Sequence, residues 1–242
     1  MPDNVAAIVL AGGRGSRMQH DVNKVYLPIG ERDMLEYSLE TMSRSKAVDR
    51  VILVVRDEDR ARAENLIAET VPAKLTNVVI GGATRHESEQ AGLEALEPDI
   101  ESGEIGIVAI HDGARPFMTL DLLQATIEAA RATGGAIPGL RVHETLYRVA
   151  DDHTEALPQG SLRRVQTPQA CWAGPLLAAY RRAAQEGYEG VDTAETVERF
   201  SDLQVAVLPG DRRNIKVTFV EDFFQAEEHA VAWDKGSWTD LE

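Results

Sequence analysis

Short apolar runs alternate with amphipathic segments along the first half of the chain. Four of the apolar runs predict buried strands, at residues 5–10, 50–55, 77–81 and 106–110. The segments between them predict helices, at residues 33–43, 57–69 and 86–96. Strands and helices that alternate with short connections require right-handed crossovers. The pattern therefore predicts an α/β fold with a mainly parallel sheet that helices cover on both faces.

The alternation breaks down in the middle of the chain. An amphipathic helix predicted at 119–132 ends at Gly134-Gly135, where glycine can adopt the left-handed conformation that caps a helix. The following segment, residues 139–165, contains β-branched residues and a polar turn but no helical apolar stripe. We expect it to form an antiparallel β-arm that protrudes from the main domain and is exchanged against a partner subunit.

The α/β pattern returns after the arm. It predicts helices at 174–186 and 192–200, a strand at 203–208 and a helix from residue 220. The last residues, 231–242, have no apolar stripe and are expected to fray. We therefore expect one Rossmann-like domain over residues 1–230, with the β-arm inside it.

Composition narrows the choice of partners. The net charge of −15 argues against general binding to nucleic acid or to anionic membranes. An anionic substrate remains compatible with this charge, because a local cluster of Arg, Lys and backbone N–H groups can bind phosphates. The chain shows no signal peptide and no apolar run long enough to span a bilayer, and its single Cys171 cannot form an intrachain disulfide. These features favour the cytoplasm, with Cys171 as a small buried residue.

The first strand leads into a glycine-rich loop, AGGRGSRM, at residues 11–18. A P-loop would continue from Gly15 with Lys and Ser or Thr, and a dinucleotide fingerprint would need glycine in place of Met18, so the loop is neither. Its glycines let the backbone approach a triphosphate, while Arg17 and Lys24 supply positive charge. Because open α/β sheets bind ligands at the carboxyl ends of their strands, the loop predicts a phosphate site.

This loop resembles the signature loop of sugar-nucleotide pyrophosphorylase-like nucleotidyltransferases. Four later segments occur in the family's order: GGATRHES (81–88), HDGARP (111–116), QTPQ (166–169) and NIKVT (214–218). Together they narrow the resemblance to the cytidylyltransferases that act on methylerythritol phosphate or ribitol phosphate. The resemblance covers nearly the whole chain up to about residue 230. It implies a nucleotidyltransferase domain that uses CTP and releases pyrophosphate.

The resemblance also implies roles for individual residues. The expected catalytic residues are Arg17, Lys24 and Lys216, which would neutralise the triphosphate and the charge that develops at its α-phosphorus. The expected nucleotide-binding residues are Ala11, Gly12, Gly13, Gly82, Ala83, Ser88 and Asp112. Asp112 is also the expected ligand of Mg²⁺, a hard ion that takes few protein ligands. Arg85 would either contact the nucleotide or anchor its loop, and both roles remain open.

The acceptor side departs from the family pattern. The expected acceptor-binding residues are Asp112, Arg115, Thr145, Gln159 and Val191, with Arg115 and Thr145 acting across a dimer interface. Gln159 stands where the family usually has a phosphate-binding arginine, and Val191 where it has a substrate-contacting threonine. Arg163, Arg164 or Thr193 could compensate. On the CTP side, Asn23 replaces the proline that usually precedes the lysine, which predicts a less rigid turn.

The resemblance leaves three functions open. We expect transfer of CMP from CTP to 2-C-methyl-D-erythritol 4-phosphate, for isoprenoid-precursor synthesis, by a Mg²⁺-dependent homodimer. A ribitol 5-phosphate cytidylyltransferase shares every CTP-side motif, and a CTP-binding sensor without acceptor chemistry is the third possibility. His111 is expected to be a packed neighbour of Asp112 rather than a base, and Thr167 and Gln169 are expected to fix a turn. The other histidines show no metal-ligand spacing and are expected at the surface: His20, His86, His143, His153 and His229.

Overall fold

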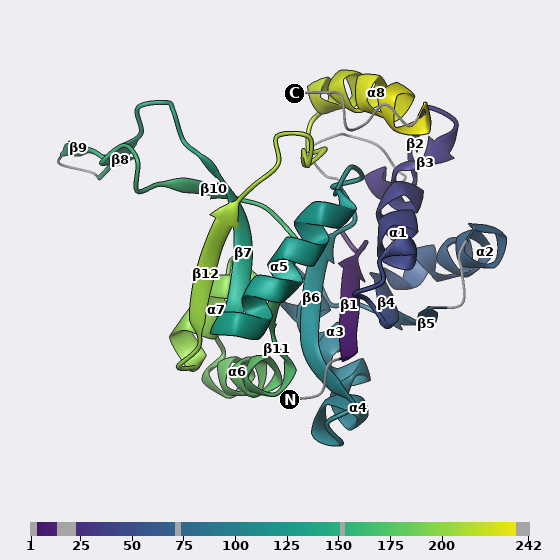
Figure 1. The fold of residues 1–242 in the computed structure, drawn as a ribbon, viewed down its shortest axis with the longest axis horizontal. Helices are drawn as coiled ribbons and strands as arrows, with labels where there is room; N and C mark the ends of the chain where they lie inside the picture. The colour runs from purple at the N-terminus through teal and green to yellow at the C-terminus, as the bar shows by residue number, and fades with distance from the viewer. Residues whose placement is uncertain (1–3, 14–22, 71–73, 151–152, 236–242) are drawn as a thin grey trace.

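The computed structural model describes residues 4–13, 23–70, 74–150 and 153–235. Its centre is a mixed, mainly parallel sheet in which eight strands are found among the described residues (Figure 1). Seven of them follow the order β10-β7-β11-β6-β1-β4-β5, and β12 pairs with β7. Their bounds are β1 (Asn4–Leu10), β4 (Arg50–Val55), β5 (Leu75–Ile80), β6 (Ile105–Asp112), β7 (Gly134–Arg141), β10 (Arg163–Val165), β11 (Gln169–Trp172) and β12 (Gln204–Pro209).

Helices cover both faces of this sheet, as the apolar runs predicted. The bounds of the α-helices are α1 (Met34–Arg44), α2 (Arg60–Thr70), α3 (Arg85–Ala95), α4 (Glu97–Glu101), α5 (Leu120–Thr133), α6 (Ala173–Glu186), α7 (Thr193–Phe200) and α8 (Val220–Asp234). Within the described ranges, no helix has the length and apolar character needed to cross a membrane.

Alternate residues of β1 belong to the two cores of the sheet. Val5, Ala7 and Val9 pack in the core that includes residues of α1, α2, α5 and α8. Ala6 and Ile8 pack in the core that includes residues of α3, α4, α6 and α7. Figure 1 shows α1 and α5 on one side of the sheet and α3 and α6 behind it. Burial on both faces explains why β1 is apolar throughout, since successive side chains of a strand point in opposite directions.

Two strands of the sheet were not predicted from the sequence. Gly134 caps α5 with a φ of 100°, as expected, but the chain then enters β7 directly instead of starting the arm. A side chain at Gly134 would also place its Cβ 2.7 Å from Cδ2 of Leu203. The second missed strand, β11, lies antiparallel between β6 and β7. The sequence of β7, GGAIPGLR, contains three glycines and a proline, which have low strand propensity and hide the pattern.

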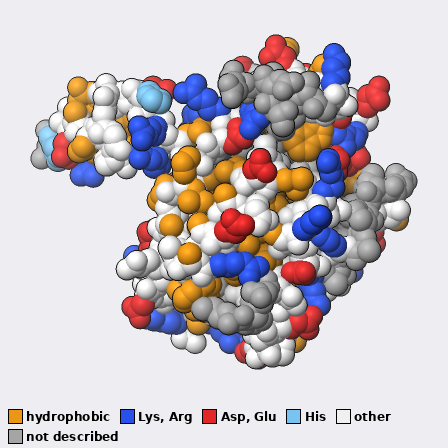
Figure 2. Space-filling model, in the orientation of Figure 1, with side chains coloured by type: hydrophobic (Ala, Val, Ile, Leu, Met, Phe, Trp, Pro, Cys, Tyr) orange, Lys and Arg blue, Asp and Glu red, His pale blue; other side chains and the backbone are white. Residues whose placement is uncertain are grey.

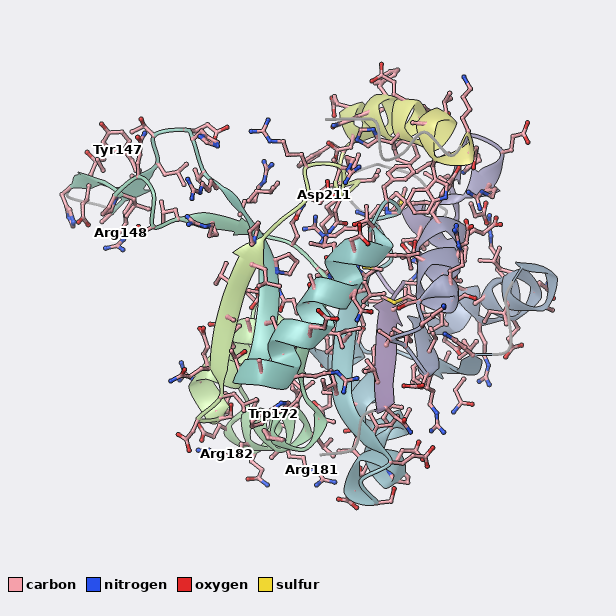
Figure 3. All side chains as sticks on the ribbon, in the orientation of Figure 1. Tyr147, Arg148, Trp172, Arg181, Arg182 and Asp211 are labelled. Carbon is pink, nitrogen blue, oxygen red and sulfur yellow. The ribbon has the colours of Figure 1, made fainter. Side chains whose placement is uncertain are left out.

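The predicted antiparallel arm is present. Its outer part pairs β8 (Tyr147–Val149) with β9 (Thr154–Ala156), and β10 returns along β7. Figure 1 shows this hairpin extending away from the rest of the molecule, and Figure 3 places Tyr147 and Arg148 on it. The arm therefore leaves the sheet after β7 and rejoins it at β10.

The C-terminal helix is longer than expected. α8 continues to Asp234, so residues 231–234 are helical rather than frayed, and residues 236–242 lie outside the described ranges. Trp233 packs edge-on against Tyr37 with ring centroids 6.2 Å apart, and Arg32 donates to Asp234 over 2.8 Å. The prediction was wrong because the contacts of Trp233 with Tyr37 and Phe117 and the ion pair of Asp234 hold this end, and these do not produce an apolar stripe.

Candidate functional site

A cavity of about 310 Å³ opens at the carboxyl ends of β1, β5 and β6. Its lining includes every residue expected to bind the nucleotide except Ala11, namely Gly12, Gly13, Gly82, Ala83, Ser88 and Asp112. Lys24, Lys216 and Arg85 line the same cavity. Arg17, the third expected catalytic residue, lies outside the described residues. The fold thus brings together segments from both halves of the chain at the predicted edge of the sheet.

Ala11 lies beneath the cavity. It is 1% exposed, and its N–H donates to the carbonyl of Val54 over 2.7 Å. Its carbonyl accepts a hydrogen bond from the side chain of Asn23. Ala11 therefore supports the loop that carries Gly12 and Gly13, and the cavity lining among the described residues does not include it.

The second loop of the cavity is held against the start of α3. Thr84 caps this helix by accepting from the N–H of Glu87 over 3.1 Å, while the Glu87 carboxylate accepts from the N–H groups of Ala83 and Thr84. A Cβ at Gly82 would lie 2.2 Å from the Cβ of Glu87, so glycine is required for this close approach. The reciprocal cap fixes Gly82 and Ala83 at the cavity wall.

Asp112, at the end of β6, is surrounded by cationic side chains. Its Oδ1 accepts from Nε of Arg85 over 3.2 Å, and its Oδ2 accepts from Nζ of Lys216 over 2.7 Å. Nε of Arg115 lies 3.9 Å from the same Oδ2. Burial alone would raise the pKa of Asp112, but Arg85, Lys216 and Arg115 outweigh it and hold the pKa well below its usual range. Asp112 is therefore ionised at neutral pH.

Arg85 connects Asp112 to a second buried carboxylate. It donates to Oε1 of Glu89 over 2.7 Å, and Glu89 is fully buried. Glu89 also accepts hydrogen bonds from the hydroxyl groups of Tyr180 and Thr193. Arg85 thus lines the cavity and anchors its wall, so the anchoring role is present, while contact with the nucleotide stays a prediction. Glu89 was missed, although its position four residues after Arg85 on one helix was a usable signal.

Two lysines approach the cavity from distant parts of the sequence. Lys24 belongs to the short 3-10 helix η2 (Lys24–Tyr26), and its Nζ donates to the carbonyl of Val217 over 2.7 Å. Val217 immediately follows Lys216, so the two lysines are attached to the same segment. Among the described lining residues, Lys24, Arg85 and Lys216 carry positive charge and Asp112 alone carries negative charge. The cavity therefore suits a polyanion even though the chain as a whole is acidic.

Asn23, directly before Lys24, is held by hydrogen bonds to distant and local groups. It is 1% exposed, and its Nδ2 donates to the carbonyl of Ala11 over 2.6 Å and to Oδ2 of Asp59 over 2.9 Å. Its Oδ1 accepts from the N–H of Val25 over 3.4 Å and caps η2. These hydrogen bonds constrain Asn23 in a different way from the ring of a proline, and the expectation of a less rigid turn stays a prediction.

His111 is a buried structural neighbour of Asp112, as expected. Its Nε2 lies 3.1 Å from the carbonyl of Arg115 and donates to it, while its Nδ1 accepts from the hydroxyl of Thr167 over 3.0 Å. The Thr167 hydroxyl in turn accepts from the N–H of Asp112 over 3.1 Å. Burial lowers the pKa of His111 to about 4, so the ring is neutral at pH 7. Gln169, also expected to fix a turn, accepts from the N–H of Ala194 over 3.0 Å.

The expected acceptor residues lie apart from the nucleotide cavity, with the exception of Asp112. Arg115 is 9% exposed and donates to the carbonyls of Asn214 and Val165. Thr145 and Gln159 meet on the arm, where Nε2 of Gln159 lies 3.4 Å from Oγ1 of Thr145. Val191 is 81% exposed in the connection between α6 and α7. The described residues that line the nucleotide cavity include none of these four.

A larger cavity, of about 1020 Å³, lies where the arm joins the body. It is lined by four arginines, Arg141, Arg163, Arg164 and Arg212, and by residues on either side of Thr145. Figure 2 shows Lys and Arg side chains along the arm and close to its base. Thr193, by contrast, is fully buried against Glu89 and is not available to compensate for Val191.

Two histidines are placed differently from the prediction, and His20 lies outside the described residues. His229 is half-buried, with its ring centroid 5.5 Å from that of Phe117. His86 is 4% exposed rather than at the surface, and its ring stacks on Tyr180 with centroids 4.6 Å apart. Its Nδ1 accepts from the N–H of Gly190 over 3.3 Å. Cys171 is buried as predicted, and burial raises the pKa of its thiol to about 12. In the described part of the chain, no three His, Cys, Asp or Glu side chains form a group that could hold a metal ion.

The chain is similar to proteins of one family over almost its whole length. The family model for 2-C-methyl-D-erythritol 4-phosphate cytidylyltransferase matches residues 5–230. The curated protein of that name from Geobacillus kaustophilus is 40% identical over 225 residues, which cover 93% of this chain and 96% of the relative. Its namesake from Geobacter metallireducens is 37% identical over 225 residues, which cover 92% of this chain and 96% of the relative.

Solved structures agree with the sequence comparison. The crystal structure of 4-diphosphocytidyl-2C-methyl-D-erythritol synthase from Anaerococcus prevotii matches with a TM-score of 0.83 and 30% sequence identity. The match covers 95% of this chain and 96% of that one. The fold, the order of the motifs and the residues gathered at the cavity all lead to the same assignment. The chain belongs to the 2-C-methyl-D-erythritol 4-phosphate cytidylyltransferase family.

Proposed function

We propose that the protein transfers CMP from CTP to 2-C-methyl-D-erythritol 4-phosphate, giving 4-diphosphocytidyl-2-C-methyl-D-erythritol and pyrophosphate. The observation that carries this proposal is the cavity in which Lys24, Arg85 and Lys216 accompany a single carboxylate, Asp112. Because its family is one of cytidylyltransferases, the chain is an enzyme of nucleotidyl transfer. The reaction belongs to the synthesis of isoprenoid precursors.

In this reaction an oxygen of the acceptor phosphate attacks the α-phosphorus of CTP. A new P–O bond forms, the bond to the bridging oxygen of the β-phosphate breaks, and pyrophosphate leaves. No base is needed, because the acceptor phosphate is already ionised at neutral pH. The chain's contribution is therefore to orient the reactants and to neutralise the charge that builds up around the α-phosphorus.

Hydrogen bonds within the protein hold the cationic side chains of the cavity in place before the nucleotide binds. Asp112 positions Lys216 at 2.7 Å and Arg85 at 3.2 Å, and the carbonyl of Val217 positions Lys24 at 2.7 Å. These contacts define where the cations stand before CTP arrives, so little reorganisation is required when the triphosphate binds. We assign Lys24 and Lys216, with Arg17 from outside the described residues, to the triphosphate.

The cavity wall formed by Gly82, Ala83 and Ser88 is our proposed site for the cytosine ring. The cavity volume of about 310 Å³ lies within the range for small-ligand sites. The tight cap of α3 keeps this wall from widening, since Glu87 already binds the N–H groups of Ala83 and Thr84.

We propose Mg²⁺ as the cofactor, with Asp112 as its protein ligand. Asp112 is the one carboxylate among the described residues that line the cavity, and its lowered pKa keeps it ionised. A single carboxylate together with phosphate oxygens matches the usual ligand set of Mg²⁺ in nucleotide-dependent enzymes. When bound, the ion would neutralise phosphate charge. Chelation by EDTA should abolish turnover, and added Mg²⁺ should restore it.

We further propose a homodimer in which the arm of each subunit completes the acceptor site of the other. The arm carries Thr145 and Gln159 away from its own nucleotide cavity, and it exposes apolar side chains, with Tyr147 59% and Val149 74% exposed. Burial of such side chains favours association. Arg163 and Arg164, which line the cavity at the base of the arm, are the candidates to bind the acceptor phosphate in place of the arginine that Gln159 replaces.

We infer that the enzyme works in the cytoplasm. Its single cysteine is buried as a free thiol, so the described fold uses no disulfide and is compatible with a reducing compartment.

Pyrophosphate release tests the proposed function. CTP should support release with methylerythritol 4-phosphate, and other nucleoside triphosphates should support much less. Lys216→Ala should reduce the rate by on the order of a hundredfold, since it removes a preorganised cation. The matched control is Lys46→Ala, which removes an exposed lysine outside the cavity and should leave the rate unchanged. A strong preference for ribitol 5-phosphate, or CTP binding without turnover of either acceptor, would refute the proposal.

A further inference from the structure

We infer that Asn23 is a positioning residue for the transfer reaction, because its side-chain amide couples the glycine-rich loop to the turn that carries Lys24. The inference rests on the proposed function, since it concerns the triphosphate end of that site. The hydrogen bond between Asn23 and the carbonyl of Ala11 is the contact that links the two segments.

The amide of Asn23 lies at the junction of two segments that line the cavity. On one side, Nδ2 donates to the carbonyl of Ala11, the residue directly before Gly12 and Gly13. On the other side, Oδ1 accepts from the N–H of Val25 and begins the helical turn of Lys24. One planar group of fixed length therefore determines the spacing between the loop backbone and the start of the Lys24 turn.

The amide is itself held in a single orientation. Its second N–H donates to Oδ2 of Asp59, and Asp59 accepts two hydrogen bonds from Arg56, from Nε over 2.7 Å and from a terminal nitrogen over 3.1 Å. Asp59 is 8% exposed and Asn23 1% exposed, so water does not compete freely for these groups. A carboxylate can only accept here, which forces the Nδ2 side of Asn23 towards Asp59 and Ala11.

Both ends of the coupled unit are anchored, one to the sheet and the other to the segment that carries Lys216. The N–H of Ala11 donates to the carbonyl of Val54 in β4 over 2.7 Å, and Arg56 directly follows β4. At the other end, Nζ of Lys24 reaches the carbonyl of Val217. Removal of the amide would leave each anchor intact but would release the connection between them. The expected result is misplacement of the loop relative to Lys24, and errors of about 1 Å in such sites cost on the order of a hundredfold in rate.

Three variants separate this coupling from a purely structural role. Asn23→Ala removes all three hydrogen bonds of the side chain and should lower kcat/KM for CTP by on the order of ten- to a hundredfold, with KM for the acceptor unchanged. Asp59→Asn keeps the bond to Ala11 and should lower Tm with a smaller loss of kcat/KM. The double variant Asn23→Asp/Asp59→Asn restores a hydrogen bond between the two positions with donor and acceptor exchanged, but it turns a carboxylate towards the Ala11 carbonyl.

The double variant decides the inference. The single variant Asn23→Asp is its reference. Relative to that variant, we expect Tm of the double variant to recover while kcat/KM for CTP stays low, because the hydrogen bond to the Ala11 carbonyl is still missing. Recovery of both quantities together would overturn the inference and leave Asn23 as a stabilising residue only. Wild-type kcat/KM in Asn23→Ala would overturn it as well. Ile127→Ala in α5 is the matched control for lost stability; it should lower Tm without changing kcat/KM below the melting range.

A CTP-binding measurement keeps the inference separate from the proposed function. If the wild-type enzyme fails to turn over methylerythritol 4-phosphate, the proposed function fails. The dissociation constant of CTP, from calorimetric titration, still decides the inference, because the coupled loop and Lys24 both face the triphosphate. Asn23→Ala should then weaken CTP binding more than Asp59→Asn does, and equal binding by wild type and Asn23→Ala would refute the coupling.

Discussion

Acidification should destabilise the protein between pH 6.5 and pH 4, and His111 is the main residue responsible. The ring is fully buried and neutral, with Nε2–H donating to the Arg115 carbonyl and Nδ1 accepting from the Thr167 hydroxyl. The Thr167 oxygen also accepts from the N–H of Asp112. A proton on Nδ1 would require Thr167 to give up its role as donor to the ring, and it would place a charge where no water can solvate it.

The size of the stability loss follows from the pKa of His111 in the folded protein and in the unfolded chain. His111 has a pKa of about 4 in the folded protein and the ordinary value of 6.5 in the unfolded chain. The unfolded chain therefore binds the proton more tightly, so stability is complete above pH 6.5 and is lost as the pH falls towards 4. Each tenfold difference in proton affinity is worth about 1.4 kcal/mol, which makes the full loss about 3 kcal/mol.

Asp112 titrates in a different and lower range. Arg85, Lys216 and Arg115 hold its folded pKa below its usual range against the opposing effect of burial. The stabilisation by this carboxylate is present above its unfolded pKa of 3.8 and is lost only as the pH falls further. Unfolding between pH 6.5 and 4 therefore reports on His111 with little contribution from Asp112.

Urea unfolding at pH 7 and pH 4.5, for wild type and His111→Gln, provides the assay. His86 and His229 also have lowered pKa values through burial, and they contribute equally to both proteins. The difference between the two proteins isolates the contribution of His111. Between pH 7 and pH 4.5, the free energy of unfolding of wild type should fall by about 2 to 3 kcal/mol more than that of the variant. An equal loss in both would refute the reasoning. If the variant does not fold, the NMR titration of the wild-type His111 ring decides, and protonation near pH 6.5 would be the contrary result.

Four further changes test the site and the arm. Arg17→Ala and Lys24→Ala should each lower kcat by on the order of a hundredfold with smaller effects on Tm, and near-normal turnover in both would remove them as catalytic residues. Gln159→Arg should lower KM for methylerythritol 4-phosphate in steady-state assays, because it restores the charge and the paired donors of arginine; an unchanged KM would show that Arg163 or Arg164 already binds the phosphate. Deletion of residues 151–155 should weaken association in analytical ultracentrifugation and raise KM for the acceptor more than for CTP, and a fully active monomer would contradict the shared acceptor site.

The parallel half of the fold could be predicted from the sequence, and the antiparallel insertion only in part. Residues 50–55 were predicted as a strand with the bounds that β4 has, because a continuous apolar run buried on both faces is a strong local signal. β7 gave no such signal, since its glycines and Pro138 carry little strand propensity and their burial depends on α5, β11 and β12. The arm was recognised because it combines β-branched residues and a polar turn with the lack of a helical apolar stripe.

At the site, motifs located the residues that touch the cavity but not those that support them. Lys24, Asp112 and Lys216 each lie in a short recognisable segment and line the cavity as predicted. Glu89 and Asn23 act through partners that are remote in sequence, such as Thr193 and Asp59. No local pattern encodes these two remote pairs, and the spacing of Glu89 four residues after Arg85 was the local signal available for Glu89.

Buried carboxylates allow an acidic chain to keep a preformed site for a polyanion. Lys216 and Arg85 both bind Asp112, while Arg85 also binds the buried Glu89. Without these carboxylates the cations would repel one another, and the cavity would have to assemble as CTP arrived. With them, the cations are held in place and Lys24 adds further positive charge, so the described lining remains net positive. A triphosphate can therefore bind next to Asp112 at little cost in reorganisation, whereas removal of Asp112 would strengthen the positive field and at the same time disorder the groups that produce it.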